Sequence, residues 1–324
     1  MGLGSIKEIR DKHLKSIPSK VFFNHFYAIE YHILSDSKRF NLKEIPYYNS
    51  LKIRNSNINI EQVKKLLWNS WSTEYAYRIG EKIDNPEYYK FSLHWNFPQA
   101  YYSVYLSLTA FHETQGTANE QHEKSIKLFG NSIKDSHYPD AISFYSSGLK
   151  NEFAFNGFKT FTGFPKDNSV LGKIECLEDA EIQLATFLKT TRRKNAEDKK
   201  DRLKRQNDKR FHNAKKEFRK SLSKSHWDMI YSTIPITSIF NLLYRLRIKA
   251  NYRDIESFIN ADIDFKKFHS SLGGLIYYLN FIHEAYITKT IGIDNFEAIL
   301  TDFPSHLNKK TAIERFEKHI KALQ

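Results

Sequence analysis

Apolar residues recur at helical spacing along several long stretches of this chain, and this periodicity constrains the fold more than any other feature. In the clearest stretch, the apolar side chains that fall on one helix face are Phe268, Leu272, Leu275, Leu279, Ile282 and Tyr286. Residues 94–116 show the same spacing. Only 12 Gly and 8 Pro occur in 324 residues, which argues against a β-sandwich with many turns. The chain is therefore predicted to be mainly α-helical.

Further helical segments are predicted on both sides of this core. They cover 19–34 and 57–83, and another helix carries His122 on one face and forms an αα-hairpin with 94–116. From these segments we expect three regions. They are N-terminal accessory helices over 1–90, a helical bundle over 91–290 with an insertion at about 140–230, and C-terminal helices over 291–324.

A small β-hairpin is predicted inside the insertion, at about 151–162. The sequence NEFAFNGFKTF places Asn156 and Gly157 between two runs of alternating Phe, and Asn-Gly is a strong signal for a hairpin turn. The aromatic side chains of this stretch are Phe153, Phe155, Phe158 and Phe161. They could stack on bases, but aromatic side chains more often pack in a core or against a partner. Packing is the favoured interpretation.

Positive charge is concentrated in one segment of the insertion. The whole chain has a formal net charge of +13. Residues 189–226 hold 16 Lys and Arg against 5 Asp and Glu, a local excess of +11. This segment has no Pro or Gly and only a thin apolar seam, so it is predicted to form a long, projecting helical arm. A solvated surface is one explanation for the charge, and a polyanionic partner, RNA first, is the other.

Candidate contacts to nucleic acid follow from this charge distribution. The arm and the helix predicted after it contribute Arg192, Arg193, Lys200, Arg202, Arg205, Lys209, Arg210, Lys216, Arg219, Lys249 and Arg253. Contacts of Lys and Arg with phosphates are expected to weaken as the salt concentration rises.

Several classes of protein are disfavoured by the sequence. A single cysteine, Cys176, excludes an internal disulfide framework and a thiolate zinc cluster, which fits a reducing cytoplasm. The N-terminus lacks the apolar region of a secretory signal, and no apolar run approaches the ~18–20 residues of a membrane span. No metal-site, Walker or dinucleotide-binding motif occurs, so no cofactor and no metal are predicted.

A second polar group stands out in residues 241–259. On one continuous helix, Arg247, Asn251 and Asp254 would fall at positions i, i+4 and i+7 and share a face. A guanidinium suits the stabilisation of a pentacoordinate phosphate, and a histidine is the usual proton carrier near neutral pH. His122 could supply that histidine if the two helix pairs pack together. The alternative is that these side chains only form hydrogen bonds between helices, with Tyr252 in the core.

Two pieces of the sequence together resemble the HEPN superfamily of helical domains, which is frequent in toxin–antitoxin and antiphage systems. The pieces are AYYSVYLSLTAFHETQG with NEQHEKSIKLFG, and LRIKANYRDIESF followed by YYLNFIHEAYI. The resemblance covers roughly 94–135 and 237–290. It implies a HEPN-like bundle, a homodimer or a complex with a partner subunit, and RNA cleavage without a metal ion.

Ribonucleases of this family carry an arginine followed, four to six residues later, by a histidine. Arg247 matches the arginine, but no histidine follows it here. Some relatives have Arg, three residues and then Asp-Tyr, and Asn251-Tyr252 takes that place. The resemblance thus implies Arg247, Asn251, Tyr252, Asp254 and His122 as candidate catalytic residues.

The expected function is RNA binding in a bacterial defence or toxin–antitoxin system, with ribonuclease activity left open. The alternative is a non-catalytic HEPN-like subunit of a defence complex that acts through protein–protein contacts.

Overall fold

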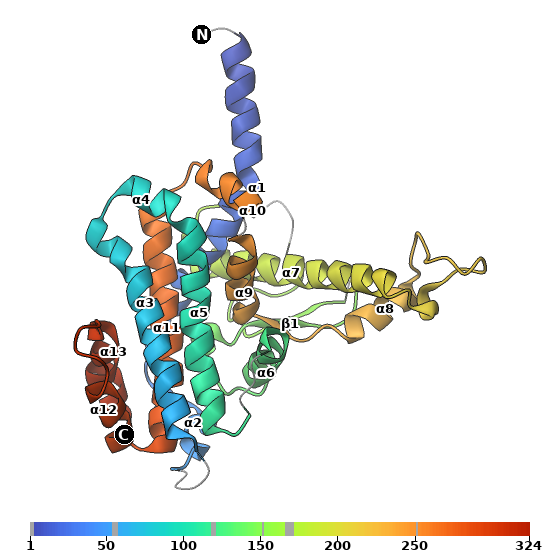
Figure 1. Cartoon of the computed structure of the whole chain (residues 1–324). Helices are drawn as coiled ribbons and strands as arrows, with labels where there is room; N and C mark the ends of the chain where they lie inside the picture. Colours follow the sequence, from blue (N-terminus) through green and yellow to red (C-terminus); the bar gives the residue numbers. More distant parts are fainter. Residues whose placement is uncertain (1–2, 54–57, 118–120, 151, 166–171, 251) are drawn as a thin grey trace.

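The computed structural model describes residues 3–53, 58–117, 121–150, 152–165, 172–250 and 252–324. The prediction of a mainly helical chain is confirmed, because helices dominate these residues and the strands are short (Figure 1). The helices are α1 (Leu3–Ser35), α2 (Pro46–Ser50), α3 (Ile60–Ile83), α4 (Pro86–Phe91), α5 (Leu93–Thr114), α6 (His122–Lys134), α7 (Leu177–Arg205), α8 (Lys224–Ser232), α9 (Ile239–Lys249), α10 (Tyr252–Ile259), α11 (Phe265–Ile291), α12 (Ile293–Thr301) and α13 (Lys310–Arg315). The strands are β1 (Tyr145–Ser147), β2 (Ala154–Asn156) and β3 (Thr237–Ser238).

Three long helices, α3, α5 and α11, lie side by side and form the centre of the molecule (Figure 1). Helix α5 packs against both of the others and also against α9, while α1 packs against α11 and α7. The apolar face predicted for 268–286 is buried in one continuous core. Phe23 of α1 and Leu67 of α3 belong to the same core, so the N-terminal helices share the packing of the bundle. In the described part of the chain, no helix has the length and apolar character needed to cross a membrane.

A buried ionic cluster joins the C-terminal segment to the bundle. The side chain of Arg315 is fully buried and donates hydrogen bonds to Glu74 of α3 (Nη1–Oε2, 2.8 Å) and Glu284 of α11 (Nε–Oε2, 2.8 Å). Trp71 Nε1 also donates to Glu284 (2.8 Å), and Asn280 Nδ2 donates to Glu74 (3.0 Å). These donors compensate the burial of two carboxylates, which would otherwise be costly.

The predicted hairpin differs from the structure in its position and its partners. Strand β2 ends at Asn156 and pairs antiparallel with β1, with Tyr145 opposite Asn156, and β3 pairs with the other edge of β1. Residues 158–165, directly after Gly157 (φ +81°), do not form a strand. Instead, the backbone N–H groups of Lys159 and Phe161 donate to the buried carboxylate of Glu181 on α7, each at 2.6 Å. The Asn-Gly pair therefore ends a strand rather than closing a hairpin.

The insertion does form a projecting arm, but the arm is not one continuous helix as predicted (Figure 1). Helix α7 ends at Arg205, because Asn207 adopts the left-handed conformation (φ +53°). The N–H of Asp208 then donates to the carbonyl of Leu203 (3.1 Å), a pattern typical of helix C-termini. The chain returns through a bridge between His212 and Phe218 and through α8.

A small separate core joins the outgoing segment of the arm, helix α7, to the returning segment, residues 208–232. It consists of the buried residues Phe153, Ala196, Leu203, Phe211, Ile230 and Tyr231. The apolar seam that the sequence shows between 203 and 222 is therefore partly used, since Leu203 and Phe211 are buried while Phe218 and Leu222 pack at the edge of this core. Because the returning segment folds back along α7, the basic side chains are spread over two antiparallel segments instead of along one helix.

Candidate functional site

Tyrosines from two helices surround the first residue of α6. Tyr101, Tyr102 and Tyr105 come from α5, and Tyr244 comes from α9. His122 lies among them: its Nδ1 is 2.7 Å from the Tyr101 hydroxyl, and its ring centroid is 4.6 Å from that of Tyr105. We call these five residues, together with Arg247, the tyrosine cluster.

Arg247 reaches the same cluster from α9. Its Nε donates to the Tyr102 hydroxyl (2.9 Å), and its guanidinium carbon is 5.8 Å from the ring centroids of both Tyr102 and Tyr244. The ring of His122 is 6.1 Å from each of the same two rings. The helix pairs therefore pack so that His122 and Arg247, which are far apart in the sequence, share two aromatic neighbours.

The surroundings of His122 keep its imidazole neutral near pH 7. Burial lowers the pKa of His122, and the positive charge of Arg247 lowers it further. Burial raises the pKa of Tyr101 far above its ordinary value, so this hydroxyl stays protonated. Tyr101 can donate to Nδ1 or accept from it, depending on the tautomer of the ring. When it accepts, Nε2 of His122 has a lone pair and can take a proton.

The cation of Arg247 is also well suited to an anionic ligand. Burial alone would lower its pKa, but the hydrogen bond to Tyr102 and the neighbouring phenolic oxygens of Tyr244 and Tyr101 raise it. Among the described residues, Arg247 donates a hydrogen bond through Nε to Tyr102, which leaves its two terminal nitrogens to form a fork toward a phosphate. The cluster thus combines a neutral proton acceptor with a permanent cation.

The other predicted catalytic residues are not placed together with Arg247 on one helix. Helix α9 ends at Lys249 and α10 begins at Tyr252, so the i, i+4, i+7 relation expected for a single helix does not apply. Asn251 lies outside the described residues, and so do the side chains of Tyr252, Arg253 and Asp254. The cluster is therefore built without them.

Arg192 is not available for a nucleic acid, in contrast to the prediction. Only 3% of it is exposed, and its guanidinium donates to the carbonyls of Gly148 (2.8 Å) and Pro235 (2.9 Å). Burial lowers its pKa to about 10. Arg245 is likewise structural, because it donates to Thr191 Oγ1 (2.7 Å). These two arginines hold the arm to the bundle.

Most of the other predicted contacts on the arm are on its surface. The exposed ones are Arg193, Arg202, Arg205, Lys209, Arg210, Lys216 and Arg219. Lys200 and Lys249 are half-buried, and Lys200 pairs with Glu197. Arg202 forms an ion pair (3.1 Å) with Glu123, the residue directly after His122. The basic surface of the arm therefore extends to the start of α6, beside the tyrosine cluster.

The aromatic side chains of residues 153–161 pack against neighbouring residues. Phe153 is buried and lies against Tyr231 (5.5 Å between centroids), and Phe158 stacks on Phe144 (5.8 Å). The packing interpretation is the one that the geometry favours over base stacking.

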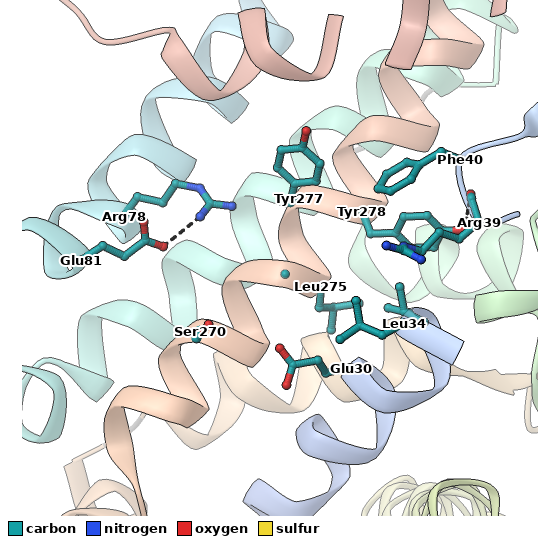
Figure 2. Close-up of a pocket in the computed structure, with 12 residues that line it drawn as sticks. Glu30, Leu34, Arg39, Phe40, Arg78, Glu81, Ser270, Leu275, Tyr277 and Tyr278 are labelled. Carbon is teal, nitrogen blue, oxygen red and sulfur yellow. Dashed lines mark hydrogen bonds and ion pairs between the residues drawn. The ribbon is translucent and has the colours of Figure 1, made fainter. Parts of the chain in front are cut away.

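A separate cavity of about 330 Å³ lies between α1, α3 and α11. Figure 2 shows Arg78 turned toward Glu81, with which it forms an ion pair of 2.9 Å. Arg78 also donates to the carbonyl of Gly273 (3.1 Å), and Ser271 Oγ donates to Glu30 (2.6 Å). Since Arg78 and Glu30 already have partners within the fold, the tyrosine cluster is the stronger candidate for chemistry.

The tyrosines are the site residues that sequence reasoning missed. Tyr101 and Tyr105 are four residues apart and therefore lie on one face of α5, beside Tyr102. This spacing was the available signal, but tyrosines at helical spacing are usually core residues. In the described part of the chain, no three His, Cys, Asp or Glu side chains are grouped so that they could hold a metal ion.

Comparisons with protein-family models, with curated proteins and with solved structures found no match to this chain.

Proposed function

We propose that this chain binds RNA and cleaves it at the tyrosine cluster without a metal ion. The observation that carries the proposal is the shared position of His122 and Arg247, a neutral imidazole and a guanidinium that contact the same two tyrosine rings. These are the two groups that cleavage by a ribose hydroxyl requires: a proton acceptor and a cation for the phosphate.

The cleavage step balances with these two residues and water. His122 Nε2 accepts the proton of the ribose 2′-OH, and the 2′-oxygen forms a bond to the adjacent phosphorus. The bond between phosphorus and the 5′-oxygen breaks, and the leaving oxygen takes a proton from solvent. The products are a 2′,3′-cyclic phosphate and a 5′-OH end. Arg247 neutralises the charge that accumulates on the non-bridging oxygens.

The arm supplies binding rather than chemistry in this proposal. Its exposed cations form a surface that meets α6 through the ion pair between Arg202 and Glu123. An RNA that follows this surface would arrive beside His122. Phosphate contacts of this kind release counterions, so affinity should fall steeply as salt is added.

The biological setting is proposed from the resemblance to the HEPN superfamily. We infer a cytoplasmic effector of a bacterial defence or toxin–antitoxin system, acting as a homodimer or with a partner subunit. The second candidate, a non-catalytic subunit, is favoured by one observation: no histidine follows Arg247 in the place where the family's ribonucleases carry it.

The deciding experiment is incubation of labelled total tRNA and single-stranded RNA with the purified protein in EDTA. The variants are Arg247→Ala and His122→Ala, and the matched control is Lys318→Ala, an exposed cation of the C-terminal segment that pairs with Glu314. We expect the wild type and the control to yield 2′,3′-cyclic phosphate ends, and both cluster variants to lose at least 100-fold in rate, by the usual effect of removing one such group.

Other outcomes separate the alternatives. RNA that shifts on a gel but stays intact would leave binding and exclude cleavage by this chain alone. Neither cleavage nor a shift, at low salt, would favour the non-catalytic subunit. Cleavage that persists in both cluster variants would refute the assignment of the site.

A further inference from the structure

The face of α5 that continues from the tyrosine cluster carries an exposed tryptophan. Trp95 is 65% exposed, and no other large apolar side chain among the described residues exceeds this value. It precedes Tyr102 by seven residues, so the two lie on the same helix face, about 10 Å apart along the axis. Gln99 lies between them on that face, and its side-chain oxygen is buried, without a hydrogen-bond partner in the described part of the chain. We call Trp95, Gln99 and Tyr102 the α5 strip.

The charge around the α5 strip suits a polyanion. Residues 88–112 contain no Asp or Glu, and they include one lysine, Lys90. Helix α9 packs beside α5, places the cation of Arg247 on Tyr102 and contains no carboxylate. An aromatic surface with this charge is matched to a nucleic-acid chain, in which each base offers a π-face and each phosphate a negative charge.

We propose that Trp95 is a stacking platform for an unpaired base of a single-stranded RNA whose neighbouring phosphate lies on Arg247. This inference rests on the proposed function and adds the class of substrate: single-stranded rather than duplex RNA. In a duplex the bases are paired and stacked on each other, so their faces are not available to a protein side chain.

The test measures binding, so that loss of chemistry does not interfere. The probe is a fluorescently labelled 2′-O-methyl oligoribonucleotide, which lacks the attacking hydroxyl, either alone or annealed to its complement. Fluorescence anisotropy gives Kd for the wild type, Trp95→Ala, Trp95→Phe and a matched control, Leu34→Ala. Leu34 is also strongly exposed but lies on α1 at the cavity of Figure 2.

We expect Trp95→Ala to weaken binding of the single strand about tenfold, which is within the usual contribution of one stacked base. Binding of the duplex should not change. Trp95→Phe should retain most of the affinity, because the ring still stacks, and Leu34→Ala should bind as the wild type does. A single abasic nucleotide at the matching position should remove the difference between the wild type and Trp95→Ala.

The remaining outcomes overturn the inference in distinguishable ways. If the wild type binds the single strand and Trp95→Ala binds it equally well, the platform is wrong while the proposed function stands. If Trp95→Ala lowers the oligomeric state in sedimentation and weakens both probes alike, the α5 strip contacts a second copy of the chain. If the wild type binds neither probe at low salt, the proposed function itself fails, and this inference fails with it.

Discussion

Replacing Arg315 tests how much the buried ionic cluster contributes to the stability of the fold. Its side chain has no solvent exposure and is the cation shared by Glu74 and Glu284, whose carboxylates are 2% and 0% exposed. Arg315→Met keeps much of the apolar length but leaves two buried carboxylates near each other. Breaking a buried ion pair in this way costs about 3–5 kcal/mol, because an uncompensated charge remains. This is a large share of the 5–15 kcal/mol that is usual for a folded domain.

Urea unfolding at pH 7, followed by circular dichroism, measures this cost. The matched control is Lys318→Met, three residues away, where the ion pair to Glu314 is exposed and a loss of only a few tenths of a kcal/mol is expected. Adding Glu284→Gln to Arg315→Met should recover part of the loss, since one buried charge is removed. A loss for Arg315→Met no larger than that of the control would show that the cluster is not buried as described.

Three further predictions follow from the site, the arm and the core. Because burial and Arg247 lower the pKa of His122, the cleavage rate should rise as the pH passes through that lowered value and be level by pH 7, and His122→Gln should remove this pH dependence. Reversing one exposed arm cation, as in Arg219→Glu, should reduce the slope of log K against log salt on single-stranded RNA by about 0.7 or more, whereas Lys318→Glu should leave the slope unchanged. Burial lowers the pKa of His283 to about 3, while the unfolded chain titrates near 6.5, so the unfolded state binds more protons between these values. The free energy of unfolding should therefore be level above about pH 6.5 and fall as the pH drops toward 3, by up to about 1.4 kcal/mol per pH unit from this group, a slope that His283→Asn should reduce.

The long helices could be predicted because their cause is local. A buried face repeats every three to four residues, and the predicted segments 57–83 and 94–116 correspond closely to α3 and α5. The end of α7 was missed because it depends on one residue, Asn207, entering the left-handed conformation in a polar segment. The strand pairing was misjudged because the partner of β2 is β1, a three-residue strand with no distinctive pattern of its own.

The site was predictable only in part for a similar reason. His122 and Arg247 could be singled out by their chemistry, but charge alone does not tell which arginine is buried. Arg192 and Arg193 are neighbours in the sequence, yet the first is enclosed by backbone carbonyls and the second is exposed. The partners of Arg315 are 31 and 241 residues away, so no local pattern could indicate them.

Helix α5 links the buried polar core to the candidate site. Its inner face is fixed by hydrogen bonds to α11, because Asn280 Nδ2 donates to Ser103 Oγ (2.9 Å) and Ser107 Oγ donates to Asn280 Oδ1 (2.7 Å). Ser103 directly follows Tyr102, the residue that receives the hydrogen bond of Arg247. Directional hydrogen bonds in a core of low dielectric constant fix both the rotation of a helix and its position along its axis. The polar core thus fixes the positions of the α5 tyrosines. These tyrosines in turn determine the distance between the guanidinium of Arg247 and the imidazole of His122.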